Sequence, residues 1–170
     1  DVFMQAVEDD ADYDLIEPSN GEVVSQLNAR MVYEKIVDLA WHNGEPGVLF
    51  IDTANKDNMT PQLGDFEATN PCGEQPLLPM EACNLGSINL AKFVVRKKDK
   101  AEIDYESLKK TVHYSVHFLD NTIDMSVYPI PEIDMMVKGN RKIGLGVMGF
   151  ADLLFELNIP YNSDEAIDLA

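Results

Sequence analysis

The sequence predicts an α/β fold, because patterns typical of strands alternate with patterns typical of helices. An amphipathic helix is expected over residues 29–42, followed by a short apolar run, residues 47–51, that suits a strand buried on both faces. A second extended stretch is expected at residues 85–90, before a long helix at residues 105–127. This order favours a sheet covered by helices.

The first part of the chain is expected to form a helix, a hairpin and a second helix. Apolar side chains recur at helical spacing over residues 1–7. Residues 13–16 and 22–24 flank the turn-forming sequence Pro-Ser-Asn-Gly, so they are expected to pair as a hairpin. The helix at residues 29–42 carries one apolar stripe, and the Asn-Gly pair after it is a typical stop.

The second part centres on the long helix at residues 105–127, whose apolar stripe is expected to pack against the strands. Two prolines at positions 129 and 131 end it. Residues 142–148 are expected to form another strand and residues 150–157 a helix. Asn162 or Ser163 should cap a last helix that is still running at the final residue.

The composition excludes several classes of protein. Thirteen Lys and Arg residues against thirty Asp and Glu give a net charge of −17, which does not suit binding to nucleic acid phosphates. No apolar run approaches the length of about 18 residues that a membrane-spanning helix needs. The start of the chain does not resemble a secretory signal. We therefore expect a cytoplasmic protein with no nucleic acid or membrane partner.

The segment with the most chemistry is Thr-Asn-Pro-Cys-Gly-Glu-Gln-Pro, residues 69–76. It places an amide at Asn70, a thiol at Cys72 and a carboxylate at Glu74 in alternate positions. Its prolines and glycine exclude a helix, so a loop or a short extended piece is expected. In an extended chain alternate residues face the same way. The three groups could then act on one small ligand. The alternative is a tight turn with an incidental buried cysteine.

A metal site is a weaker hypothesis. His113 and His117 lie four apart on the long helix, with Asp120 and Asp124 continuing the same face. The glutamate of an H-E-x-x-H motif is absent, because Tyr114 stands in its place. The two cysteines, Cys72 and Cys83, also match no zinc spacing. We expect a partly solvated polar face with no metal.

Residues 144–149 match G-x-G-x-x-G, the fingerprint of dinucleotide-binding folds. That fingerprint requires an apolar strand directly before its first glycine, whereas residues 137–143 are polar and contain a glycine. The glycines are therefore expected to permit close packing of strands and helices rather than to bind a nicotinamide cofactor.

Two motifs together closely resemble ribonucleotide reductases. These are Asn-Pro-Cys-Gly-Glu at residues 70–74 and Cys-Asn-Leu-Gly-Ser-Ile-Asn-Leu at residues 83–90. The proline and glycine of the first motif look like the adenosylcobalamin-dependent class II enzymes, and the resemblance covers essentially the whole chain. It implies part of a ten-stranded α/β barrel, with residues 66–80 as a finger loop that carries the catalytic cysteine into its centre. Residues 1–170 would be a single barrel segment, truncated at both ends.

The resemblance also implies roles for four catalytic residues. Cys72 corresponds to the cysteine that becomes a thiyl radical and takes the 3′ hydrogen of the ribose. Glu74 corresponds to the general base on the 3′-hydroxyl, and Asn70 to the residue that orients the ribose hydroxyls. Cys83 corresponds to one half of the dithiol that supplies electrons, and the resemblance places the other half outside this segment.

The implied reaction is the reduction of ribonucleotides to 2′-deoxyribonucleotides, with adenosylcobalamin bound mainly by parts of the enzyme outside this segment. The implied partners are the ribonucleotide substrate, the remainder of the reductase chain and a thioredoxin-like reductant. A homodimer is compatible with these features. The segment alone is expected to be inactive, and the sequence leaves diphosphate and triphosphate substrates as alternatives.

Two other functions remain open from the sequence. Cys72 and Cys83 could form a thiol–disulfide oxidoreductase pair, although redox motifs usually place their cysteines closer together at the start of a helix. The chain could also be a non-catalytic nucleotide-binding fragment.

Overall fold

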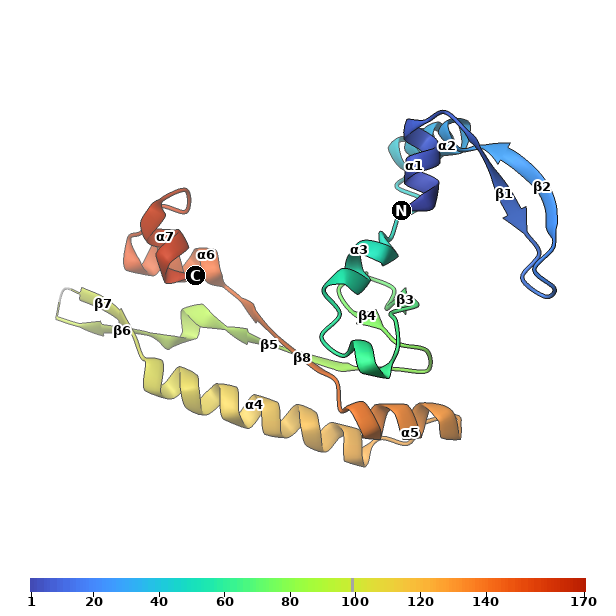
Figure 1. Ribbon diagram of the computed structural model, residues 1–170. Coiled ribbons are helices and arrows are strands. Elements are labelled where there is room, and N and C mark those ends of the chain that lie inside the picture. The colour runs from blue at the N-terminus through green and yellow to red at the C-terminus, as the bar shows by residue number, and fades with distance from the viewer. Residues whose placement is uncertain (99) are drawn as a thin grey trace. The chain divides into compact units, whose positions relative to one another are not determined.

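The computed structural model describes residues 1–98 and 100–170. The chain divides into two compact units, Asp1–Pro79 and Met80–Ala170. Both units contain helices and strands, as the sequence predicts (Figure 1). Every sheet among the described residues has two strands.

The first unit begins with helix α1 (Val2–Glu8), followed by an antiparallel hairpin of β1 (Asp12–Ile16) and β2 (Val23–Asn28). Helix α2 (Ala29–Asn43) follows directly. It starts there because the Asn28 side chain caps it, accepting a hydrogen bond from a backbone N–H of the first turn at 2.9 Å. It ends at Gly44, whose φ of 85° is left-handed. These elements confirm the prediction for this part of the chain.

The buried strand predicted at residues 47–51 is wrong. Residues 45–50 have no regular structure, the apolar side chains of Val48, Leu49 and Phe50 are exposed, and helix α3 (Ile51–Lys56) begins at the end of the run. A strand buried on both faces needs hydrogen-bonded neighbours and a layer on each side. Within this unit, the described residues give the run at residues 47–51 neither a hydrogen-bonded neighbouring strand nor a covering layer on each side.

The remainder of the first unit is held by asparagine side chains. Asn55 donates to the carbonyl of Phe66 at 3.0 Å and accepts from its N–H at 2.7 Å. A 3-10 helix, η1 (Pro61–Leu63), lies between them in the chain. The short strands β3 (Ala68–Thr69) and β4 (Pro76–Leu77) then pair antiparallel. This hairpin, the β3–β4 hairpin, carries the predicted finger segment.

The second unit is built on two parallel strands, β5 (Asn84–Asn89) and β8 (Ile143–Met148). Asn84 pairs with Ile143 at one end of the register. Helix α4 (Tyr105–Met125) contacts both strands, which gives a β-α-β arrangement (Figure 1). The strand predictions for this part of the chain are confirmed.

Smaller elements complete the second unit. A 3-10 turn, η2 (Leu90–Phe93), leads from β5 into a hairpin of β6 (Val94–Lys97) and β7 (Lys100–Ile103). Helix α6 (Phe150–Leu157) packs against η2 and this hairpin, and α7 (Asp164–Leu169) is capped by Ser163. Both helices were predicted.

The long helix α4 packs along only part of its predicted stripe. Leu119 and Ile123 are 4% and 1% exposed, whereas Val112 and Val116 are exposed within the described chain. The helix also ends at Met125, two residues before the predicted end, so Val127 lies outside it. Leu119 lies against β5, where a Cβ on Gly86 would meet its side chain at 3.7 Å.

Besides α3, a second helix was not predicted from the sequence. Helix α5 (Pro131–Asn140) begins with a proline in its first turn, followed by Glu132 and Asp134, and ends at Arg141 with a left-handed backbone. It packs against α4. The buried apolar side chains of the second unit are Ile88, Leu119, Ile123, Val137, Leu153, Leu154 and Ala166.

Candidate functional site

The β3–β4 hairpin presents three of the four predicted site residues at its tip. Thr69 pairs with Pro76, and the N–H of Asn70 donates to the carbonyl of Gln75 at 3.3 Å, so the paired strands end at these residues. Cys72 and Glu74 lie between them and are both exposed. Asn70, Cys72 and Glu74 are therefore brought together in one short turn.

Asn70 organises this turn. Its side-chain Oδ1 accepts from the N–H of Gln75 at 3.0 Å, across the mouth of the hairpin. Its backbone carbonyl accepts from the N–H of Gly73 at 3.0 Å and from the hydroxyl of Thr69 at 2.9 Å. Oδ1 is engaged in the turn, which leaves the Nδ2 amino group, the donor of the carboxamide, to bind a ligand.

Of the two expected conformations, a loop or a short extended piece, the structure has the loop, because residues 70–73 form a turn. Asn, Pro and Gly at the first, second and fourth positions are typical of such turns, and Gly73 has a φ of 84°. The alternate spacing of the three groups is therefore not what brings them together. The alternative was a tight turn with a buried cysteine: the turn is present, but the Cys72 side chain is exposed.

Cys83 lies in the second unit, directly before β5, and is half-buried. Both cysteines of the chain are thiols, and neither stands at the start of a helix. A helix start is where a redox-active cysteine pair is usually found. The arrangement therefore does not favour the thiol–disulfide oxidoreductase hypothesis.

A buried carboxylate that the sequence analysis did not single out lies two residues before Cys83. The Glu81 side chain is 1% exposed. Its Oε1 accepts from Asn140 Nδ2 at 2.9 Å, and its Oε2 accepts from the Lys142 ammonium at 2.6 Å. We call these three residues the Glu81 cluster. In the sequence, this cluster is indicated only by a glutamate two residues before a cysteine.

Next to this cluster, Arg141 joins α5 to α4. Its guanidinium donates to the Asp120 carboxylate at 2.7 Å and to the Asp124 carboxylate at 2.9 Å. The Arg141 hydrogen bond is the main reason that the pKa of Asp120 lies below its usual value, and the two carboxylates raise the pKa of Arg141. Asp120 and Asp124, weighed as metal ligands, are thus engaged in ion pairs.

The histidines of the weaker metal hypothesis, His113 and His117, are exposed on α4. Over residues 1–98 and 100–170, no group of three or more His, Cys, Asp or Glu side chains is placed to hold a metal ion. In the same residues, no helix is long and apolar enough to cross a membrane.

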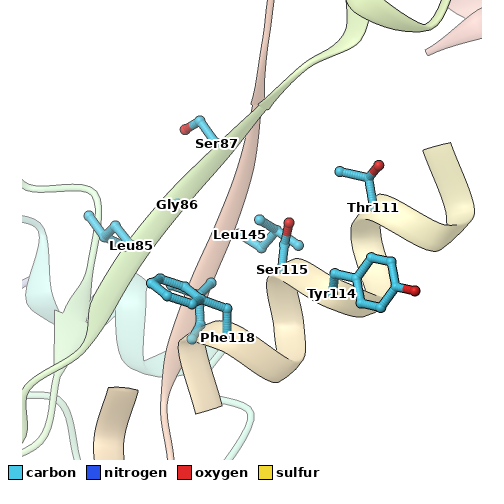
Figure 2. Close-up of a pocket in the computed structure, with 9 residues that line it drawn as sticks. Leu85, Gly86, Ser87, Thr111, Tyr114, Ser115, Phe118 and Leu145 are labelled. Carbon is cyan, nitrogen blue, oxygen red and sulfur yellow. The ribbon is translucent and has the colours of Figure 1, made fainter. Parts of the chain in front are cut away.

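A shallow groove lies between β5 and α4, close to Cys83 in the sequence. Figure 2 shows Leu85 and Ser87 on the strand, and Tyr114, Ser115 and Phe118 on the helix. Its volume is about 370 Å³, the size of a small-ligand site. None of the four predicted site residues lines it, so the groove is not the predicted site.

The glycine motif has a packing role. Gly144 and Gly146 lie inside β8 itself, not in a loop that follows a strand. Gly149 caps α6 with a φ of 72°, and a Cβ there would lie 2.4 Å from Asn89 Oδ1. The motif therefore lacks the strand-loop-helix context of a dinucleotide site, and close packing is the expectation that the geometry supports.

Comparison with known proteins gives one consistent family. The profile described as "Ribonucleotide reductase, barrel domain" matches residues 1–170. Vitamin B12-dependent ribonucleoside-diphosphate reductases from Thermoplasma acidophilum and Mycobacterium tuberculosis are each 46% identical to this chain, over 99% and 100% of its length. A vitamin B12-dependent ribonucleotide reductase from Agrobacterium fabrum is 36% identical over the whole chain.

The chain spans only 22%, 24% and 13% of the length of these three relatives. The β-α-β arrangement of its second unit is consistent with an α/β barrel, of which so short a stretch would form one part. Because the family profile covers every residue of the chain, the chain belongs to the ribonucleotide reductase barrel-domain family.

Proposed function

We propose that this chain is a segment of the catalytic barrel of an adenosylcobalamin-dependent ribonucleotide reductase. The observation that carries the proposal is the β3–β4 hairpin, which presents an amide, a thiol and a carboxylate in one turn. The resemblance of residues 70–74 and 83–90 to class II enzymes supports the cofactor class, as do the names of the relatives. We expect the protein to act in the cytoplasm.

Cys72 is the residue that we assign to hydrogen abstraction. Its exposed position at the hairpin tip leaves the sulfur accessible to a ribose and to a second reactant from outside the hairpin. A thiyl radical at Cys72 takes the hydrogen atom from C3′, and Cys72 returns a hydrogen atom to C3′ at the end of the turnover. The thiol has to remain neutral for this step, since the thiolate has no hydrogen to lose.

Glu74 and Asn70 act on the ribose hydroxyls. Glu74 accepts the proton of the 3′-hydroxyl as a general base, which helps to expel the 2′-oxygen. Asn70 donates through Nδ2 to a ribose hydroxyl, while its Oδ1 stays bound to the N–H of Gln75. The turn thus fixes the orientation of the amide before substrate binds.

Cys83 supplies reducing equivalents together with a partner cysteine from the remainder of the reductase chain. The two thiols lose two hydrogen atoms and become a disulfide. One hydrogen ends on C2′ and the other leaves in water with the 2′-oxygen, so the C2′–O bond breaks and a C2′–H bond forms. A thioredoxin-like dithiol then reduces the disulfide by exchange.

Adenosylcobalamin, when bound, supplies the radical that removes the hydrogen atom from the Cys72 thiol. The exposed sulfur fits this role, because so large a reactant has to approach from outside the hairpin. We place its binding surface mainly outside this segment. For the same reason, we expect the isolated segment to be inactive.

The test compares two cysteine variants in the full-length reductase that contains this chain. Cys72→Ser should abolish both 3′-hydrogen exchange and deoxynucleotide formation, because a serine hydroxyl holds its hydrogen too strongly. Cys83→Ser should retain 3′-hydrogen exchange and lose multiple turnover, because only the electron supply is removed. The measurements are release of tritium from the 3′ position and deoxynucleotide yield.

Retained 3′ chemistry in Cys72→Ser would overturn the assignment of Cys72. Full multiple turnover with thioredoxin in Cys83→Ser would overturn the assignment of Cys83. A Cys72–Cys83 disulfide trapped as an obligatory intermediate would favour a thiol–disulfide oxidoreductase instead.

A further inference from the structure

We infer that Glu81 is a positioning residue that holds the Cys83 thiol in place for electron delivery. The inference rests on the proposed function, since it concerns the step assigned to Cys83. Its basis is the Glu81 cluster, which lies at the point where the chain enters β5.

Both oxygens of the Glu81 carboxylate are engaged. Oε1 accepts from an amide and Oε2 from an ammonium group, and the side chain is 1% exposed. Lys142 is itself only 24% exposed. A carboxylate buried to this degree is costly unless it stays paired, so the cluster has a strong preference for one geometry.

The cluster links the entrances of the two parallel strands. Asn140 is the last residue of α5, and Lys142 directly precedes β8. Glu81 stands three positions before Asn84, the residue that pairs with Ile143 at the start of the sheet. The side chain of Glu81 therefore ties the segment before β5 to the segment before β8.

Cys83 lies between two anchored positions. On one side, Glu81 is held by its two hydrogen bonds to the α5–β8 junction. On the other side, Asn84 pairs with β8, and its Nδ2 donates to the carbonyl of Leu119 on α4 at 3.0 Å. Because Glu81 and Asn84 are both held in place, the backbone at Cys83 between them has little freedom to move.

A general contribution to stability does not require a buried charge here. Well-packed apolar side chains of similar volume often stabilise a protein as well as a buried ion pair does. Among the chain's described ion pairs, Lys97–Glu102 joins the hairpin strands β6 and β7 with both side chains at least half exposed. The Glu81 cluster differs in its burial and in its place beside a cysteine that has to meet a partner thiol.

The test is Glu81→Gln in the full-length reductase. Both partners of Glu81 are hydrogen-bond donors, so a glutamine amide would place its own donor against one of them. Loss of one anchor should shift Cys83, and a displacement of about 1 Å can cost about 100-fold in a reaction step. We expect deoxynucleotide formed per 3′-exchange event to fall by about 10- to 100-fold.

A second readout does not depend on turnover. In a Cys72→Ser background, the rate at which a thiol reagent modifies Cys83 is measured by mass spectrometry of the peptide. We expect Glu81→Gln to raise this rate, because an unanchored thiol is reached more often. Glu102→Gln is the matched control: the same substitution, at an exposed ion pair of the same unit, should change neither readout.

The double variant Glu81→Gln/Lys142→Met separates positioning from folding. It removes both charges, so it avoids the uncompensated buried charge that a single replacement of Lys142 would leave. The anchor is still lost, and the ratio of product to 3′ exchange should therefore stay low in folded enzyme. A double variant with the wild-type ratio and wild-type modification rate would overturn the inference.

Two outcomes distinguish this inference from the proposed function. If Glu81→Gln lowers 3′ exchange and product in the same proportion, the effect is on folding and the inference is wrong. If wild-type enzyme and Cys83→Ser show no 3′ exchange at all, the proposed function is wrong, whatever Glu81→Gln does.

Discussion

Replacing Gly149 by alanine should destabilise the start of helix α6. Gly149 has a φ of 72°, a conformation that costs an L-residue about 1–2 kcal/mol. The added Cβ would lie 2.4 Å from Asn89 Oδ1, so the asparagine has to move. Asn89 would then lose its cap on η2, where it accepts from the N–H of Ala91, at a cost of about 1 kcal/mol.

The two effects together predict a loss of about 2–3 kcal/mol for local opening of α6. The assay is amide hydrogen exchange by mass spectrometry on peptides that cover Phe150–Leu157, measured in the full-length protein. Exchange through local opening should become about 30- to 150-fold faster, following the change in opening free energy.

Gly139→Ala is the matched control. Gly139 lies inside α5, and a Cβ there would meet nothing within 4 Å. Because alanine is favoured over glycine in a helix, this change should stabilise α5 by about 0.5–1 kcal/mol and slow its exchange. Equal effects of the two substitutions, or unchanged protection of α6 in Gly149→Ala, would refute the reasoning.

Three other outcomes are expected. Asn28→Ala should destabilise α2 by about 1 kcal/mol through loss of its cap, seen as faster exchange in that helix. Arg141→Met should raise the pKa of Asp120 in an NMR titration. That pKa is depressed in the folded state, so the ion pair stabilises the protein at pH values above the unfolded pKa of Asp120. This stabilisation is lost as the pH falls through the folded pKa. The stability of the variant should therefore change less with acid than that of the wild type. Elemental analysis should find no metal bound through His113 and His117, and stoichiometric zinc or iron lost in His117→Ala would contradict this.

The elements that could be predicted from the sequence carry their own local signals. Helix α2 has an apolar stripe within its own residues and a glycine stop directly after them. Helix α6 has four apolar positions on one face, Phe150, Leu153, Leu154 and Leu157, before it ends at Asn158. In both cases tertiary packing agrees with local preference, so the boundaries are predicted to within a residue.

The errors in secondary structure arise where the local sequence pattern is compatible with more than one element. A short apolar run such as residues 47–51 has no periodicity that separates a buried strand from other structures, and the outcome depends on neighbours elsewhere in the fold. Helix α5 was missed because it contains Gly139 and ends among polar residues, which obscure a helical pattern. The proline in its first turn and the acidic residues after it were the better signal.

The candidate site was only partly predictable. The residue types at Asn70, Cys72 and Glu74 indicated the chemistry, but the sequence did not decide between a loop and a short extended piece. The turn depends on hydrogen bonds that Asn70 makes with Gly73 and Gln75. The Glu81 cluster could not be predicted, because its members lie about 60 residues apart and meet only when β5 and β8 pair.

The parallel pairing of β5 with β8 also has a consequence for synthesis on the ribosome. Because Asn84 pairs with Ile143, β5 has to wait for about 60 more residues to be made, which takes about 3–12 s at typical elongation rates. Helix α4 can form during this interval, since its hydrogen bonds are local. During this interval the nascent β5, with Ile88 still uncovered, is exposed to misassembly, and a chaperone that binds nascent chains would protect it.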